Sequence, residues 1–148
     1  LNAHAGRLED LAGRSAQTVI TPHAGELGRL LVRGSSEVSA HRLASAREGA
    51  ERSGAVVVLK GDDTVVAAPG GPVAVSRGAT AALATAGTGD VLSGVIATLM
   101  AKGLDPFSAA ATGVFAHARA GVLAAERMGA DHTIASDVIG ALPGAFAR

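Results

Sequence analysis

The chain has 148 residues, enough for one domain, and 48% of them are hydrophobic, so a sizeable core can be buried. Its 13 basic and 13 acidic residues cancel, which argues against a nucleic-acid partner because such proteins carry a basic surface. The absence of cysteine excludes disulfides and thiolate metal sites. No apolar run reaches the ~18 residues of a membrane span, and LNAHAGRLED is no signal peptide. We therefore expect a cytoplasmic protein without a membrane partner.

The first elements that the sequence predicts, in chain order, are a short strand over 17–21 and a helix that follows Pro22. The helix is indicated by apolar residues at the i, i+3, i+4 spacing of one face, which are Leu27, Leu30 and Leu31. A second helix is predicted from a serine cap at 35 or 36 to a glycine stop at 54. The residues expected on its buried side are Val38, Leu43 and Ala46.

Three strands are predicted after these helices. The β-branched run AVVVLK (55–60) is typical of a strand buried on both faces, as in a parallel sheet flanked by helices. The runs TVVAA (64–68) and PVAVS (72–76) follow after short turns that contain glycine, aspartate or proline. This spacing favours hairpin strands.

The remainder of the chain is predicted to be helical, over about 90–102, 106–128 and 136–147. Asp105-Pro106 and Ser136-Asp137 supply N-terminal cap signals for the last two helices. Strands and helices in this order predict an α/β layer fold. We expect residues 1–148 to form a single domain that resembles part of a larger doubly wound domain.

A glycine-rich loop in the stretch ATAGTGDVLSG (84–94) comes directly before a predicted helix. A helix N-terminus has unpaired backbone N–H groups and the positive end of the helix dipole, and glycines let a ligand approach the backbone. The stretch therefore predicts an anion site, most often for phosphate, at Gly87, Thr88 and Gly89, with the hydroxyls of Thr85 or Thr88 as further donors. It is not a Walker A loop, because the pattern G-x-x-x-x-G-K-[ST] is not present. It is not a dinucleotide fingerprint either, because Leu92 stands where the fingerprint needs a small residue.

Asp90 distinguishes this loop from a simple phosphate-binding loop. Its carboxylate would repel a phosphate, but the helix dipole stabilises its ionised form. The combination suits a base or a hydrogen-bond acceptor aimed at a substrate hydroxyl near a phosphate. An ordinary turn followed by a helix-capping Asp explains the same residues equally well.

Three other stretches carry candidate residues, and each has a simpler structural explanation. His23 lies between a strand and a helix, at the edge where ligands gather in open α/β sheets, although a polar helix-start residue is commoner there. Lys60 ends a buried strand and can reach a phosphate, although a solvated lysine is commoner. Asp62 and Asp63 could hold a metal, although such a pair more often forms a turn. His117 is best explained as a semi-buried histidine.

In order along the chain, five segments resemble the C-terminal half of the ADP/ATP-dependent NAD(P)H-hydrate dehydratases. The segments are TPHAGELGRLL, VVLKGDDTVVAAPGG, LATAGTGDVLSGVIATLMAKG, GVFAHARAG and IASDVIGALPGAF. Together they cover nearly the whole chain. That family belongs to the ribokinase-like superfamily, so the resemblance implies a three-layer αβα fold with a mostly parallel sheet.

The resemblance implies a repair reaction in which hydrated NADH or NADPH (NADHX or NADPHX) is converted back to the normal cofactor and ADP or ATP is consumed. A divalent cation, Mg²⁺, is expected with the nucleotide. By this resemblance Asp90 would contact the hydrate and act as the base on its hydroxyl, and His23 would lie beside the hydrated nicotinamide. The residues implied in nucleotide binding are Lys60, Gly61, Asp62, Asp63, Thr64, Thr85, Ala86, Gly87, Thr88 and Gly89. The partners expected are further copies of the chain in a homo-oligomer and an epimerase domain or protein.

The chain departs from the family pattern at its start, where LNAHAG stands in place of an acidic segment of the DADAL kind. If Asn2 and His4 occupy the aligned positions, two carboxylates are lost. Two other functions remain open from the sequence. One is a kinase of the same superfamily acting on a vitamin-precursor alcohol, and the other is an inactive domain that binds nucleotide or mediates assembly.

Overall fold

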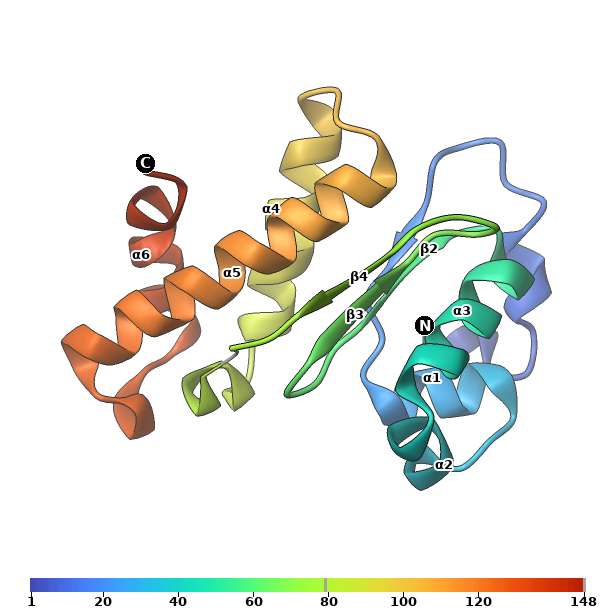
Figure 1. Ribbon diagram of the computed structural model, residues 1–148, viewed down its shortest axis with the longest axis horizontal. Coiled ribbons are helices and arrows are strands. Elements are labelled where there is room, and N and C mark those ends of the chain that lie inside the picture. The colour runs from blue at the N-terminus through green and yellow to red at the C-terminus, as the bar shows by residue number, and fades with distance from the viewer. Residues whose placement is uncertain (79, 148) are drawn as a thin grey trace. The chain divides into compact units, whose positions relative to one another are not determined.

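The computed structural model describes residues 1–78 and 80–147, which divide into two compact units, Leu1–Val75 and Ser76–Arg148. The strands are β1 (Val19–Ile20), β2 (Val56–Leu59), β3 (Thr64–Ala67) and β4 (Val73–Ser76). The α-helices are α1 (Ala24–Leu31), α2 (Ser35–Ala40), α3 (Arg42–Ser53), α4 (Thr88–Ala101), α5 (Pro106–Met128) and α6 (Ala135–Phe146) (Figure 1). Four short 3₁₀ helices complete the list: η1 (Asn2–His4), η2 (Leu8–Leu11), η3 (Ala81–Ala84) and η4 (Ala130–His132).

The four strands form one sheet in the order β1-β2-β3-β4, so all four predicted strands are confirmed. The pair β1 and β2 is parallel, with Val19 opposite Val56. The pair β2 and β3 is antiparallel, with Leu59 opposite Val65, as the predicted hairpin requires. The α/β fold class is confirmed, but the part of the sheet that this chain carries is mixed rather than mostly parallel, because β3 returns beside β2 as a hairpin.

The first unit has its core between the sheet and the helices α1, α2 and α3, which lie on one face of β2 and β3 (Figure 1). Every residue of β2 is buried, as the β-branched run predicts. Val57 and Leu59 alternate along the strand and face the helices, since side chains of a strand point to opposite faces at every second residue. The helices contribute, among others, Leu27, Leu30, Val38 and Ala46.

The second predicted helix is wrong in one respect, because the structure has two helices, α2 and α3, in its place. The chain leaves the helical conformation at His41, whose φ of −125° and ψ of 46° end α2 and begin α3. The change of direction also corrects the prediction for Leu43, which is 47% exposed rather than buried. Small residues face the core in α3 instead, and a Cβ on Gly49 would lie 3.0 Å from Cδ1 of Leu27, so the helix packs close to its neighbours.

The second unit consists of helices, and the three long ones agree with the prediction. The Asp105 carboxylate caps α5 by accepting a 3.0 Å hydrogen bond from the Ser108 N–H, and Pro106 occupies the first helical position. The predicted cap of α6 is corrected, because Ile134 is the N-cap and Asp137 reaches back to accept its N–H at 3.0 Å. Within residues 1–78 and 80–147, no helix has both the length and the hydropathy needed to cross a bilayer.

Candidate nucleotide and substrate site

The glycine loop ends at Gly87, which is the N-cap of α4 and has a φ of 88°. This left-handed conformation costs any residue with a Cβ, so glycine is required by the backbone. Packing imposes the same requirement, because a Cβ at Gly87 would lie 3.2 Å from the Cβ of Ala135 at the start of α6. The sequence folds here into a tight turn that delivers Thr88, Gly89 and Asp90 into the first turn of α4.

The threonine hydroxyls of this loop are bonded to carbonyl oxygens of the chain itself, which corrects the expectation that they are free donors for an anion. Thr88 is 4% exposed, and its Oγ1 lies 2.6 Å from the carbonyl oxygen of Leu83 and 2.8 Å from that of Thr85. Thr85 Oγ1 donates to the carbonyl oxygen of Thr133 at 3.1 Å. A hydroxyl has one proton to donate, so neither is left for a ligand in this conformation.

Backbone N–H groups remain as the donors of the loop. Among the described residues, no hydrogen bond engages the N–H of Ala86, Gly87 or Gly89, whereas the N–H of Asp90 donates to the Gly87 carbonyl oxygen at 3.1 Å. Three unpaired donors at a helix N-terminus suit an anion, because the helix dipole adds its positive end. The geometry therefore fits the phosphates of a nucleotide.

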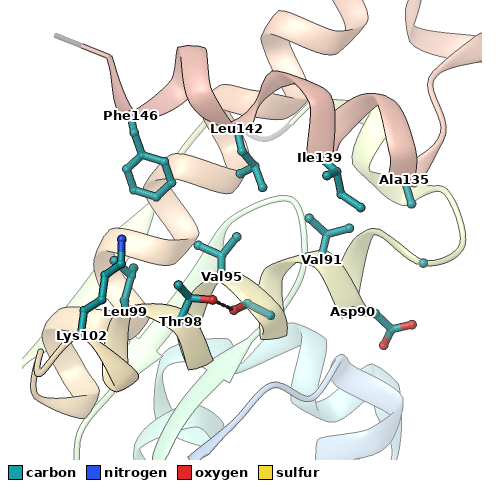
Figure 2. A pocket seen from close by; sticks show the side chains of 12 residues that line it. Asp90, Val91, Val95, Thr98, Leu99, Lys102, Ala135, Ile139, Leu142 and Phe146 are labelled. Atoms are coloured by element: carbon teal, nitrogen blue, oxygen red, sulfur yellow. Dashed lines mark hydrogen bonds between the residues drawn. The ribbon is translucent and has the colours of Figure 1, made fainter.

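Asp90 is exposed and borders an apolar groove of about 860 Å³ within the second unit. Figure 2 shows Asp90 at one end and Lys102 at the other, with side chains of α4 and α6 facing each other between them. The apolar side chains that line the groove are Val91, Val95, Leu99, Ile139, Leu142 and Phe146. The carboxylate is thus accessible to a small molecule, as a base acting on a substrate must be.

His23 and Lys60 are neighbours at the carboxyl end of the parallel pair β1 and β2. A parallel bridge joins the two residues, and the Lys60 N–H donates to the carbonyl oxygen of Pro22 at 2.9 Å. This is the edge at which open α/β sheets bind ligands, so the placement agrees with the prediction for both residues. His23 is also the N-cap of α1, and its side chain is 55% exposed.

Glu26 connects these two side chains, and sequence reasoning did not single it out. Its Oε2 accepts the His23 backbone N–H at 2.8 Å and lies 3.9 Å from the Lys60 ammonium. His23 Nδ1 in turn accepts the N–H of Gly25 at 3.0 Å and that of Glu26 at 3.3 Å, so the ring proton belongs on Nε2. The pattern H-x-x-E before an apolar run is a capping box with histidine in the place of serine or threonine, and it is the signal that could have found Glu26.

The turn from Lys60 to Thr64 is bound to the first residue of α3. Asp63 carries an ion pair with Arg42, whose Nε lies 2.7 Å from Oδ1 of Asp63, whereas Asp62 is exposed. The Thr64 hydroxyl points back into the turn and donates to the carbonyl oxygen of Gly61 at 3.4 Å. No local sequence pattern predicts that Arg42 binds this turn, because Arg42 lies 21 positions before Asp63.

The site residues thus fall into two groups, one in each unit. The structure brings His23 together with Lys60 and its turn in the first unit, and it brings the loop 85–89 together with Asp90 in the second. His117 belongs to neither group; it is buried in α5, as the structural explanation of it predicts. Over the described ranges 1–78 and 80–147, no cluster of three or more histidine or acidic side chains could hold a metal ion.

A model of the NAD(P)H-hydrate dehydratase family matches residues 1–143. The chain belongs to the NAD(P)H-hydrate dehydratase family. Among curated relatives, it is 46% identical over 148 residues to the bifunctional NAD(P)H-hydrate repair enzyme Nnr of Salinibacter ruber, covering 97% of the chain and 26% of the relative. The Nnr of Thermofilum pendens is 44% identical over 138 residues, 93% of the chain and 26% of the relative. The chain therefore spans about a quarter of the length of these relatives.

Solved structures give the same family and the fold. The ADP/ATP-dependent NAD(P)H-hydrate dehydratase of Bacillus subtilis, co-crystallized with ATP/Mg²⁺, superposes with a TM-score of 0.84 and 32% identity over 90% of this chain and 48% of that chain. A ribokinase-like superfamily protein of Enterococcus faecalis superposes with a TM-score of 0.71 and 28% identity over 85% of this chain and 42% of its own. The fold is therefore ribokinase-like, as the resemblance implies.

Proposed function

We propose that this chain carries the nucleotide site and the base of an ADP- or ATP-dependent dehydratase that restores NADH or NADPH from NADHX or NADPHX. The observation that carries the proposal is the loop Ala86–Gly89 with Asp90 in the first turn of α4, in a chain that belongs to this family. Unpaired N–H groups and an accessible carboxylate stand next to each other there. This is an anion site with its own base.

The residues divide the chemistry between them. The nucleotide supplies a phosphoryl group, which turns the ring hydroxyl of the hydrate into a leaving group. Asp90 accepts the hydroxyl proton as the hydroxyl oxygen bonds to the terminal phosphorus of the nucleotide, and the bond from that phosphorus to the rest of the nucleotide breaks, which releases AMP from ADP or ADP from ATP. The phosphate then departs with the C–O electron pair, and the neighbouring ring carbon loses its proton to water, which restores the double bond of the ring. The N–H groups of Ala86, Gly87 and Gly89 bind the nucleotide phosphates, and the turn from Lys60 to Thr64 is the other segment that we propose binds nucleotide. His23 lies beside the hydrated ring.

Mg²⁺ is proposed to arrive with the nucleotide, as the ATP/Mg²⁺ used with the Bacillus subtilis dehydratase supports. The residues of this chain fit such a weakly held ion, because Mg²⁺ keeps several waters and is often bound through substrate phosphates and one or two carboxylates. Asp63 is engaged by Arg42, whereas Asp62 is exposed and available.

The partners and the compartment are part of the same proposal. Exposed large apolar side chains, among them Phe115, Ile139 and Phe146, support a homo-oligomer. The relatives named bifunctional repair enzymes support an epimerase domain or protein as a second partner. The absence of cysteine accords with the reducing cytoplasm.

The test is to incubate the full-length protein that contains these residues with hydrated NADH and with ADP or ATP. Recovery of the near-ultraviolet absorbance of NADH, with one inorganic phosphate released per NADH, is expected. Nucleotide-dependent phosphorylation of an alcohol without recovery of NADH would instead show a kinase. Nucleotide binding without any turnover would show an inactive binding domain, and either result overturns the proposal.

A further inference from the structure

Arg42 is the first residue of α3, and its side chain is only 18% exposed. The break at His41 sets the start of α3 and with it the place of this side chain. From there the guanidinium reaches residues that lie 17 to 21 positions further along the chain, at the end of β2 and in the turn that follows. A long charged side chain is seldom buried to this extent unless it is paired.

The guanidinium binds both ends of the turn between β2 and β3. Its Nη2 donates to the carbonyl oxygen of Leu59 at 3.0 Å and to that of Asp63 at 2.6 Å. Its Nε lies 2.7 Å from Oδ1 of Asp63. One nitrogen at the tip of the guanidinium therefore sets the distance between residues 59 and 63. The ammonium of a lysine would end one bond short of that position, near Cζ, so it could not make both hydrogen bonds without a shift of the turn.

Gly61 gives an independent indication that the turn is built around this guanidinium. A Cβ at Gly61 would lie 2.6 Å from Nη2 and 2.7 Å from Nη1 of Arg42. Gly61 is not among the glycines with positive φ, so its backbone conformation does not require glycine. A side chain at position 61 would therefore displace the guanidinium from its place, and glycine leaves room for it.

We propose that Arg42 is a positioning residue for the nucleotide-binding turn, holding Lys60 to Thr64 in the shape that receives the nucleotide. The inference rests on the proposed function, because it takes this turn as part of the nucleotide site. Arg42 acts through the carbonyl oxygens of Leu59 and Asp63, and the ligand meets the residues between them. Loss of the guanidinium lets the turn relax and lowers nucleotide affinity in a protein that is still folded.

The first test compares Arg42→Lys with Arg47→Lys, a matched control at an exposed position of the same helix. ATP and ADP affinities are measured by titration calorimetry, and folding is checked by circular dichroism and thermal unfolding. Arg42→Lys is expected to weaken nucleotide binding about tenfold, since two hydrogen bonds to a charged donor are lost. The control is expected to bind like the wild type. Equal affinity in Arg42→Lys and wild type overturns the inference.

The second test is a double-mutant cycle of Gly61→Ala and Arg42→Ala. If the alanine side chain at position 61 acts by displacing the Arg42 guanidinium, Gly61→Ala weakens nucleotide binding when Arg42 is present. The same change then has little further effect in the Arg42→Ala background. Additive effects would overturn the inference. The single variant Gly61→Ala keeps Arg42 and displaces its guanidinium, so its nucleotide affinity gives a result even if the Arg42 variants fail to fold, and an affinity equal to that of the wild type would overturn the inference. If the wild type does not bind nucleotide, the proposed function itself is overturned. If the wild type binds nucleotide but the Arg42 variants bind equally well, only the inference fails.

Discussion

Asp90 has its carboxylate in the first turn of α4, exposed and at one end of an apolar groove. Its negative charge would repel phosphates at the adjacent N–H groups, so a loop that only bound phosphate would gain nothing from a carboxylate here. A side chain that serves only as a cap would gain nothing from facing a cavity. Among the described residues, no backbone N–H of α4 donates to the Asp90 carboxylate, so the capping bond of the simpler explanation is not formed, and the proposed role as a base rests on the position of Asp90 at the groove.

For Asp90→Asn we expect loss of turnover with nucleotide affinity unchanged or tighter. The amide cannot accept the hydroxyl proton, and a negative charge next to the phosphates is removed. Turnover is measured as NADH recovery and affinity by calorimetry. Asp131→Asn, at an exposed position in η4, is the matched control and should behave like the wild type. Loss of nucleotide binding in Asp90→Asn would show that Asp90 is structural.

For Gly87→Ala we expect a lower free energy of unfolding, by about 1–2 kcal/mol from the left-handed backbone alone. The 3.2 Å approach to Ala135 adds to this cost and shifts the loop, so nucleotide affinity should fall as well. Gly70→Ala is the control, since Gly70 has a φ of 57° but nothing within 4 Å of its Cβ position. Denaturant unfolding and calorimetry report the two effects. Equal losses of stability in the two variants would refute the packing argument.

At the scale of elements, local signals predicted where helices begin more reliably than where they are interrupted. The Asp105-Pro106 signal starts α5 as predicted, because both residues act within one turn of the helix. The break at His41 has no such signal. Two helices form between Ser35 and Ser53 because α3 packs along the sheet with Ala46 and Ala50 in the core. This packing depends on tertiary contacts, which no local pattern specifies.

The cap of α5 gives a prediction for pH. The hydrogen bonds from the Ser108 side chain and backbone hold the pKa of Asp105 below its ordinary value. A lowered pKa in the folded state means that the stabilisation is present above the ordinary value of about 4 and is lost as the pH falls through the lower folded value. Asp105→Asn keeps a cap but does not titrate, so its melting temperature should fall less steeply than that of the wild type between neutral and acid pH.

The control for this measurement is Glu9→Gln. The side-chain hydrogen bond from Arg52 lowers the pKa of Glu9 in the same direction, so this variant should remove a separate part of the acid dependence. If the melting temperature falls equally steeply with acid in the wild type and in Asp105→Asn, the role given to the Asp105 cap is contradicted.

At the scale of the whole molecule, each unit has a core of its own, and each carries one group of site residues. The Bacillus subtilis dehydratase is about twice as long as the part of it that this chain covers. The site of that protein can therefore draw on residues beyond the match. We propose that this chain contributes the anion loop, the base and the turn that Arg42 holds.

Nucleotide binding should appear as stabilisation of the chain. A ligand that binds only the folded state at 100 times its dissociation constant adds about 2.7 kcal/mol to the free energy of unfolding. For a chain of this size, that corresponds to a rise of roughly 5–10 °C in the melting temperature, measured by thermal unfolding with ATP or ADP. Asp90→Asn should keep the rise and Gly87→Ala should reduce it. No rise in the wild type would contradict the nucleotide site.

The sequence by itself determined the features that act over a few residues. The buried strand β2, the hairpin after it, the glycine loop before α4 and the placement of Asp90 all follow from patterns within one turn or one strand. The positions of His23 and Lys60 at strand ends were predictable for the same reason. The family was predictable from the order of five segments along nearly the whole chain.

Only the tertiary structure decided what depends on residues that are distant along the chain. It engaged the threonine hydroxyls of the loop with carbonyl oxygens of the chain, paired Glu26 with Lys60, and placed Arg42 against Gly61. These contacts join residues up to 48 positions apart, as between Thr85 and Thr133. Hydrogen-bond partners at such separations are fixed by how helices pack on a sheet or on one another. A local sequence pattern does not specify that packing.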